Sequence, residues 1–283
     1  MTNKQIELPY MDFFLEAFEE GDSELIKSVG RHAHWGYWEA PTEANGSGSD
    51  FAKAAEDMCS QVYVAANVGD GQSVLDVGCG FGGAIASINE GFTNMKLVGL
   101  NIDERQLERA RNEVKAAESN QVEFVWGDAC QLPFPEDSFD VVLANECIFH
   151  FPSREGFFAE AKRVLRSGGR LGISDYVPTE ILQPFLKLWN LSGLSSIIYG
   201  KCDLSYSLTD YHRLARESGL KILREYDITV NTLPTYPFFR QIMEVTATKV
   251  RFDLQAEFKL TTDLSEWASA QGLMRYMIFS MIA

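Results

Sequence analysis

The stretch "LDVGCGFGGA" (75–84) decides the fold, because it joins a strand-like run to a helical pattern through a cluster of glycines. The apolar run "SVLDV" (73–77) leads into it, and "GGAIASINE" (82–90) follows with residues that favour a helix. Glycines allow the backbone to approach a ligand closely, and the start of the helix presents free backbone N–H groups to that ligand. The stretch is therefore typical of a cofactor site at the end of a first strand.

The glycine spacing fits two templates. Gly78, Gly80 and Gly82 match GxGxG, whereas Gly78, Gly80 and Gly83 match the GxGxxG fingerprint of NAD-binding proteins. Asp76 distinguishes them, because a carboxylate is repelled by a pyrophosphate and stabilised by an ammonium group. S-adenosylmethionine carries an ammonium and a sulfonium group and no phosphate. Asp76 thus favours this cofactor, and an NAD-dependent oxidoreductase is kept as a remote alternative.

From residue 73 onward, short apolar runs alternate with helical stretches. This alternation predicts a parallel sheet that is covered by helices on both faces. The predicted strands are 73–77, 96–100, 122–126, 139–144, 170–175, 220–230 and 272–283. The predicted helices between them include 82–90, 103–117, 154–166 and 207–219. The fold class is therefore α/β: a Rossmann-like, seven-stranded, mostly parallel sheet with a helical cap over its C-terminal edge.

We expect one domain over residues 1–283. Its expected parts are N-terminal helices (1–66), a cofactor-binding core (67–176), two helical cap insertions (177–206 and 231–271) and two returns to the core (207–230 and 272–283). Within the second insertion, residues 236–260 read as one long helix. The cap is rich in aromatic residues, which predicts an apolar or aromatic ligand beneath it: Phe185, Trp189, Tyr199, Phe238 and Phe239.

Composition narrows the class of partner. The net charge of −15 repels phosphate polyanions, so we expect no nucleic-acid partner and no acidic membrane surface. No apolar run is long enough to cross a bilayer, and the N-terminal segment lacks the apolar core of a signal peptide. The five cysteines form no CxxC pair and no metal-ligand spacing, which predicts a cytoplasmic protein without a metal. A small-molecule acceptor fits best, and the oligomeric state stays open.

Several motifs together resemble the class I S-adenosylmethionine-dependent methyltransferases. The resemblance runs from residue 32 to about residue 175, roughly half of the chain. It is most similar to small-molecule enzymes of secondary metabolism, such as rebeccamycin sugar O-methyltransferase, geranyl diphosphate C-methyltransferase and sarcosine/dimethylglycine N-methyltransferase. The motifs are "HAHWGYW" (32–38), "LDVGCGFGG" (75–83), "GDACQLPF" (127–134), "SFDVVLANE" (138–146) and "EAKRVLRSGGRLGISD" (160–175).

The resemblance implies a set of cofactor-binding residues for S-adenosyl-L-methionine and its product S-adenosyl-L-homocysteine. The methionine part would contact the glycine turn and the fourth strand, the ribose the second strand, and the adenine the loop after the third strand. His34 and Tyr37 would close over the cofactor. The full set is Asp76, Gly78, Cys79, Gly80, Asn101, Ile102, Gln106, Asp128, Ala129, Asn145, His34 and Tyr37.

One position departs from the family pattern. Most members carry an acidic residue at the end of the second strand, whereas this chain has Asn101. An amide can bond the ribose hydroxyls but forms no charge-assisted bond. In similar enzymes a glutamine five residues later, here Gln106, reaches the ribose. Gln106 also has the spacing of a capping box with Asp103, and both interpretations stay open.

The segment "NECIFHF" (145–151) supplies candidates for the chemistry. His150 follows the fourth strand and Asp175 ends the fifth, and ligands sit beyond these ends in open parallel sheets. We therefore expect His150 as general base, oriented by Asp175, with a spacing that resembles the acid–base pair of the rebeccamycin sugar enzyme. Methyl transfer to a hydroxyl is the first prediction. Methylation of an amine, indole or isoprenoid is the alternative, with Glu146 stabilising a cationic acceptor.

Overall fold

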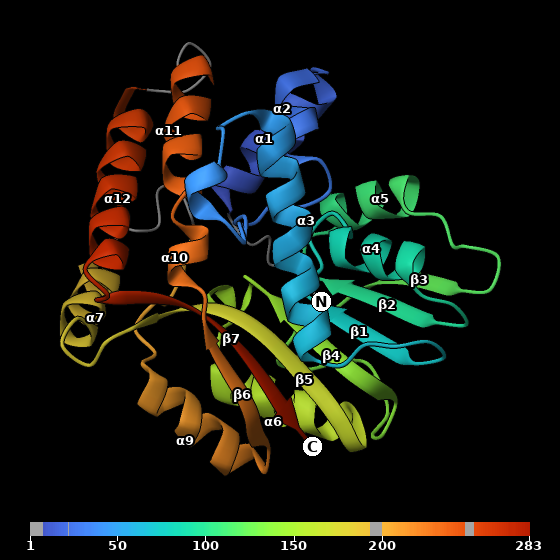
Figure 1. Ribbon diagram of the computed structural model, residues 1–283. Helices are drawn as coiled ribbons and strands as arrows, with labels where there is room; N and C mark the ends of the chain where they lie inside the picture. The colour runs from blue at the N-terminus through green and yellow to red at the C-terminus, as the bar shows by residue number, and fades with distance from the viewer. Residues whose placement is uncertain (1–7, 22, 193–199, 247–251) are drawn as a thin grey trace.

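The computed structural model describes residues 8–21, 23–192, 200–246 and 252–283. Its centre is a seven-stranded sheet with the order β3-β2-β1-β4-β5-β7-β6, in which β7 runs antiparallel to both neighbours. The predicted mostly parallel sheet is thus confirmed (Figure 1). The strands are β1 (Ser73–Val77), β2 (Lys96–Asn101), β3 (Gln121–Trp126), β4 (Phe139–Asn145), β5 (Leu165–Pro178), β6 (Lys221–Asp227) and β7 (Met274–Ile282).

Helices cover both faces of this sheet, and its central strands are accordingly buried on both sides and mostly apolar. Buried side chains of α3, α4 and α5 form the core of one face, and those of α6 and α9 form the core of the other. The helices are α1 (Pro9–Glu19), α2 (Ser23–Val29), α3 (Gly48–Ala65), α4 (Gly83–Gly91), α5 (Glu104–Glu113), α6 (Arg154–Val164), α7 (Gln183–Ser192), α9 (Leu208–Ser218), α10 (Thr229–Thr232), α11 (Thr235–Thr246) and α12 (Phe252–Ala270).

Some predicted boundaries are wrong. The single helix expected over 236–260 consists of α11 and α12, and residues 247–251 lie outside the described residues. The strand expected over 220–230 ends at Asp227, because Thr229 starts the short helix α10. The end of α9 is as predicted, since Gly219 adopts a left-handed conformation with φ of 79°.

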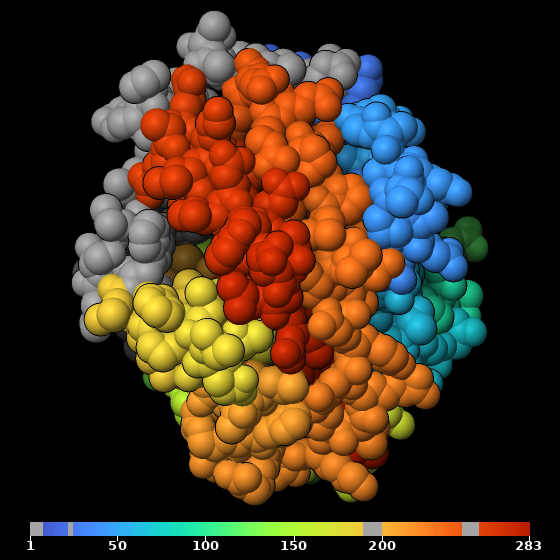
Figure 2. Space-filling model, turned by 60° about the vertical axis from the view of Figure 1, so that its left-hand side comes forward, coloured from blue at the N-terminus to red at the C-terminus, as the bar shows by residue number. Residues whose placement is uncertain are grey.

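A layer of helices lies beside the edge of the sheet at which β1, β2 and β4 end. Figure 2 shows α11 and α12 side by side on one face of the molecule, next to N-terminal residues. An aromatic stack fixes α11 to α3, with 4.0 Å between the ring centroids of Phe51 and Phe238. Opposite, α1 and α2 pack on Phe81 of the glycine turn. Among the described helices, none has both the length and the apolar character needed to cross a membrane.

Candidate active site

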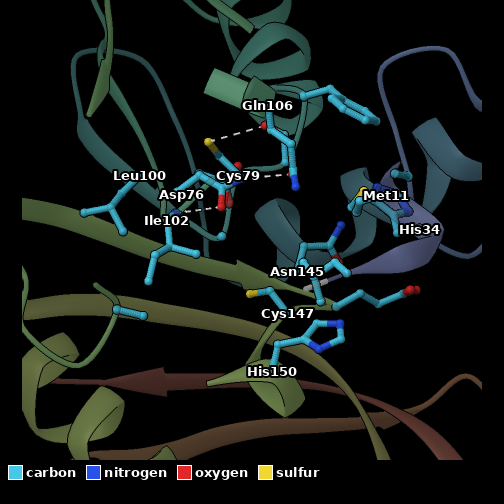
Figure 3. Close-up of a pocket in the computed structure, with 18 of the residues that line it drawn as sticks. Met11, His34, Asp76, Cys79, Leu100, Ile102, Gln106, Asn145, Cys147 and His150 are labelled. Carbon is cyan, nitrogen blue, oxygen red and sulfur yellow. Dashed lines mark hydrogen bonds between the residues drawn. The ribbon is translucent and has the colours of Figure 1, made fainter. Parts of the chain in front are cut away.

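A cavity lies at the carboxyl ends of β1, β2 and β4, where an open parallel sheet holds its ligands. In Figure 3, Asp76 and Gln106 approach it from one side, and Asn145, His150 and His34 from the other. We call it the cofactor cavity. Each predicted cofactor residue except Tyr37 lines it: Asp76, Gly78, Cys79, Gly80, Asn101, Ile102, Gln106, Asp128, Ala129, Asn145 and His34.

The glycine turn gives this cavity its floor. Gly78 has φ of 75°, and a Cβ there would lie 2.7 Å from the Cβ of Cys147, so no side chain fits. Gly80 has φ of 53°, and a Cβ there would meet nothing closer than the Gln106 Oε1 at 3.9 Å. The backbone of Gly80 is therefore open to the cavity. A ligand can approach it closely, as expected from the sequence.

Asp76 is the most unusual group in the cofactor cavity. Its side chain is only 2% exposed, and within the described part of the chain no donor reaches its carboxylate. Burial raises the pKa of Asp76 to about 7. A buried carboxylate without a partner is costly unless a cation approaches it. The residue therefore fits a positively charged ligand and not a phosphate.

At the end of β2, two buried amides face the cofactor cavity. The Asn101 side chain donates to Gln106 Oε1 over 3.0 Å, and its own Oδ1 accepts from the Ile102 N–H. The Asp103 N–H also reaches Asn101 Oδ1, at 3.3 Å, so Gln106 forms no reciprocal capping box with it. Gln106 instead donates to the Asp103 carboxylate over 3.3 Å. The ribose interpretation of Gln106 stays a prediction, while the capping-box interpretation is wrong.

A second, larger cavity adjoins the first. It has a volume of about 470 Å³ and lies between the N-terminal helices, β5, α11 and α12. We call it the acceptor cavity. Phe238 and Phe239, two of the predicted cap aromatics, line it, whereas Phe185 is exposed. The side chains of Trp189 and Tyr199, also predicted there, lie outside the described residues. The other aromatic residues in its walls are Tyr10, Phe13, Phe14, Trp35, Phe51, Phe149, Tyr176 and Phe258.

Glu146 lies in the walls of both cavities. It follows β4 with a φ of 48°, a left-handed conformation that turns the chain sharply out of the strand. Its Oε1 accepts hydrogen bonds from the Tyr276 hydroxyl and, at 2.9 Å, from the backbone N–H of Trp35. Burial raises the pKa of Glu146 to about 8, although both bonds act in the opposite direction. A carboxyl with such a pKa can exchange a proton near neutral pH.

His150 lines the cofactor cavity from a short 3-10 turn, Ile148–His150. Its Nδ1 lies 3.2 Å from the Lys201 carbonyl oxygen, which can only accept, so Nδ1 carries the hydrogen. Nε2 then accepts from the Tyr10 hydroxyl at 3.1 Å. Burial lowers the pKa of His150 to about 4. The imidazole is therefore neutral at pH 7, and both of its nitrogens have protein partners.

The expected contact between His150 and Asp175 is wrong. Asp175 is 0% exposed and pairs with Arg154 of α6 at 2.6 Å, and it accepts from the Tyr211 hydroxyl of α9. The reason is the alternation of side chains along a strand. Ser174 points to the cavity side, where its hydroxyl meets Asn145 and Glu146, so its neighbour Asp175 points to the opposite face. Asp175 thus holds two helices against the sheet.

Tyr37 does not lie at the cofactor cavity, where the sequence predicted it. It lines neither the cofactor cavity nor the acceptor cavity, and its ring packs partly buried against the core on the α3 face. Its backbone N–H donates to the Ala54 carbonyl, which turns the segment away from the cavities after Trp35. His34 remains in place and lines both cavities.

Three groups at the junction of the cavities were not predicted. Tyr276 and the backbone N–H of Trp35 bond Glu146, and Tyr10 bonds His150. Tyr276 reaches the site because β7 inserts beside β5, where it pairs with Tyr176. These groups are more than 100 residues from their partners, and no local pattern in the sequence marks them.

Together, the fold and the site define a Rossmann-like protein that holds a cationic cofactor beside an apolar cavity. The family model described as "Methyltransferase domain" matches residues 75–173. Methyltransferase GfsG of Streptomyces halstedii is 34% identical over 222 residues, which cover 76% of this chain and 75% of that one. The chain therefore belongs to the methyltransferase family. It is an S-adenosylmethionine-dependent enzyme of the small-molecule type, and the NAD alternative is set aside.

Other similar proteins act on different atoms. O-methyltransferase cnsE of Penicillium expansum is 28% identical over 79% of this chain and 78% of its own. Sterol 24-C-methyltransferase ERG6B of Gibberella zeae is 44% identical, but over 42% of this chain and 32% of its own. The mycolic acid cyclopropane synthase CmaA1, solved with S-adenosylhomocysteine, superimposes with a TM-score of 0.78 at 14% identity, covering 98% of this chain and 99% of its own. At that identity the likeness supports the fold alone.

The Asp76→Asn variant tests whether this carboxylate receives the cofactor. We expect S-adenosylhomocysteine to bind roughly 10- to 100-fold more weakly, the value of one charge-assisted bond. In the unliganded wild type, Asp76 should contribute a loss of stability as the pH rises from about 4 to 7, because the unfolded chain releases the Asp76 proton before the folded chain does. The difference in stability between the wild type and the asparagine variant should therefore change over this pH range in favour of the variant. Calorimetry and urea unfolding across pH measure both effects, and unchanged affinity would contradict the assignment.

Proposed function

We propose that this enzyme transfers a methyl group to a hydroxyl of a small, apolar natural product bound in the acceptor cavity. The observation that carries the proposal is the position of Glu146 in the walls of both cavities. A group in that position can reach an acceptor atom and the methyl donor together. The mainly aromatic walls support an apolar or aromatic acceptor skeleton.

The residues proposed for cofactor binding are those of the cofactor cavity. Asp76 would accept from the cofactor's ammonium group, Asn101 and Gln106 would bond the ribose, and Asp128 with the Ala129 backbone would hold the adenine. Bound S-adenosylmethionine supplies an electrophilic methyl group on a sulfonium. The chain contributes position, since in-line transfer to an acceptor depends chiefly on alignment and distance. Aromatic walls also exclude water from the acceptor cavity.

For the proton of the acceptor hydroxyl, we propose Glu146 as the base in place of His150. Glu146 has a pKa of about 8 and, once ionised, can take up that proton. His150 has a pKa of about 4, which makes it a weak base, and Tyr10 already bonds its Nε2. In this proposal Tyr276 and the Trp35 N–H orient the Glu146 carboxylate, and His150 holds Tyr10 in the wall.

Methylation of carbon is the second candidate. Adding a methyl group to an alkene or indole leaves a cation, which a carboxylate at the end of an aromatic cavity would stabilise. Carbon methylation is favoured by the aromatic residues that share the walls with Glu146, namely Trp35, Tyr176 and Phe239. Among the residues that the structure describes, no corresponding feature singles out an amine acceptor. We further propose a cytoplasmic location, which the five free cysteines support.

A methyl-transfer assay with matched acceptors tests the proposal. The purified enzyme is incubated with radiolabelled S-adenosylmethionine and three compounds of one apolar skeleton, which bear a hydroxyl, an amine or an alkene. We expect label in the alcohol as a methyl ether. Label in the alkene alone would replace the first candidate with the second. Polar sugars are tested in parallel, and label in them but in none of the apolar compounds would contradict the proposed acceptor class.

A further inference from the structure

Two histidines and a cysteine meet in the wall that the two cavities share. His32 and His34 belong to the segment after α2 and line both cavities, while Cys59 belongs to α3. The ring nitrogens and the thiol sulfur lie within 4.8 Å of one another. His32 and Cys59 are buried. Neither the cofactor nor the proposed reaction uses Cys59.

The hydrogen positions on the two imidazoles follow from their outer partners. His34 Nδ1 lies 2.9 Å from the Trp35 carbonyl oxygen, which can only accept, so Nδ1 is the protonated nitrogen. His32 Nε2 lies 2.7 Å from the Glu56 carboxylate. The same carboxylate oxygen accepts from Arg31, so Glu56 acts as an acceptor and His32 Nε2 carries a hydrogen.

The two inner nitrogens therefore face each other across the gap between the rings. His34 Nε2 and His32 Nδ1 are 3.1 Å apart. A positive charge between these two nitrogens would satisfy both of them. Outside the histidine pair, Glu56 also binds Arg31, which in turn binds Glu90 of α4.

We propose that His32 Nδ1, His34 Nε2 and the Cys59 thiolate bind one zinc ion. Nitrogen and sulfur donors suit zinc, and the 3.1 Å between the nitrogens is close to the spacing of two ligands on one tetrahedral ion. The outer contacts also match, because metal-bound histidines usually donate their other N–H to a carboxylate or a backbone carbonyl. Binding releases the thiol proton, and three protein ligands leave one position open.

Such an ion would tie the segment after α2 to α3 at the wall of both cavities. Sequence spacing did not indicate it, because the sulfur donor comes from a separate helix. Arg31 and Glu56 would form the outer contacts that hold His32 in place. No step of the proposed methyl transfer passes through the ion, but the site shares His34 with the wall of the cofactor cavity.

Metal titration of the full chain tests this proposal. The protein is first stripped with a chelator and then titrated with Zn²⁺ by calorimetry and with Co²⁺ by absorption spectroscopy. We expect one equivalent of either ion and a cobalt–thiolate charge-transfer band in the wild type. Glu56→Gln should weaken binding about 10- to 100-fold, as removal of an outer-shell partner does. Cys59→Ser should lose the cobalt–thiolate band.

Two variants are matched controls. His212→Gln removes an exposed histidine that pairs with Glu225, and Cys130→Ser removes a cysteine outside the cluster. Both should bind as the wild type does. If Cys59→Ser does not fold, His34→Gln replaces it, with loss of the one-equivalent Zn²⁺ binding as the expected result. A wild type that binds no ion at one equivalent would overturn the proposal and assign the charge to a shared proton. Equal binding by Cys59→Ser or His34→Gln would also overturn it.

Discussion

Replacing Arg154 with methionine is expected to lower the free energy of unfolding by about 3–5 kcal/mol, because it leaves a buried carboxylate without its cation. Arg154 is 2% exposed and binds Asp175 at 2.6 Å and the Asp203 carbonyl at 2.7 Å. The Tyr211 hydroxyl also donates to Asp175. Methionine fills a similar volume and supplies neither charge nor donor. Urea unfolding at pH 7, followed by circular dichroism, measures the loss.

Two further variants make the result specific. Arg213→Met removes an arginine of α9 that pairs with partly exposed glutamates, and it should change stability by about 0.5 kcal/mol or less. The double variant Arg154→Met/Asp175→Asn should be more stable than Arg154→Met, because no buried charge is left alone. A wild-type unfolding curve for Arg154→Met would contradict the structural role of this pair. In that case the expected link from Asp175 to His150 would have to be considered again.

The strands were predictable because the sheet is buried on both faces. Runs such as 73–77 are buried at every position and mostly apolar, and they end at glycine or polar residues that mark the carboxyl edge. The positions of the strand ends did not show toward which face of the sheet a given side chain points. Ser174 and Asp175 are adjacent in sequence, yet one contacts Glu146 and the other Arg154. A shift of one residue decides between the cavity and the opposite core.

The cofactor side of the site was predictable in the same way, and the acceptor side was not. The cofactor residues lie at or just after the ends of β1, β2, β3 and β4, which are neighbours in the sheet, so each could be found from a strand end. The partners of Glu146 come from the segment before α3 and from β7, near opposite ends of the chain. Long-range packing creates these contacts, and it also raises the pKa of Glu146 by burial. Neither the contacts nor the raised pKa of Glu146 is marked by a local pattern in the sequence.

Replacing Glu146 with glutamine is expected to lower kcat about 10²- to 10⁴-fold, the usual contribution of a general base. Glutamine has nearly the same shape, and its Oε1 can still accept from Tyr276 and from the Trp35 N–H, so the fold should be kept. What it lacks is the ability to take up a proton. Steady-state kinetics with the acceptor found by the matched assay measure kcat, and calorimetry with S-adenosylhomocysteine checks that the cofactor cavity is intact.

The pH profile and two comparison variants separate this role from the alternatives. In the wild type, kcat/KM should rise with pH until Glu146 is ionised, near its pKa of about 8, and then level off. Tyr276→Phe should shift this rise to higher pH, because the Tyr276 bond lowers the pKa of Glu146.

His150→Gln should retain the rise with at most about a tenfold lower kcat, since a wall contact is lost and not the base. A larger kcat loss in His150→Gln than in Glu146→Gln would return the base to His150. A different result would assign Glu146 to stabilising a cation. In that result the acceptor atom is carbon, Glu146→Gln lowers kcat as strongly as expected, and kcat/KM of the wild type does not rise with pH.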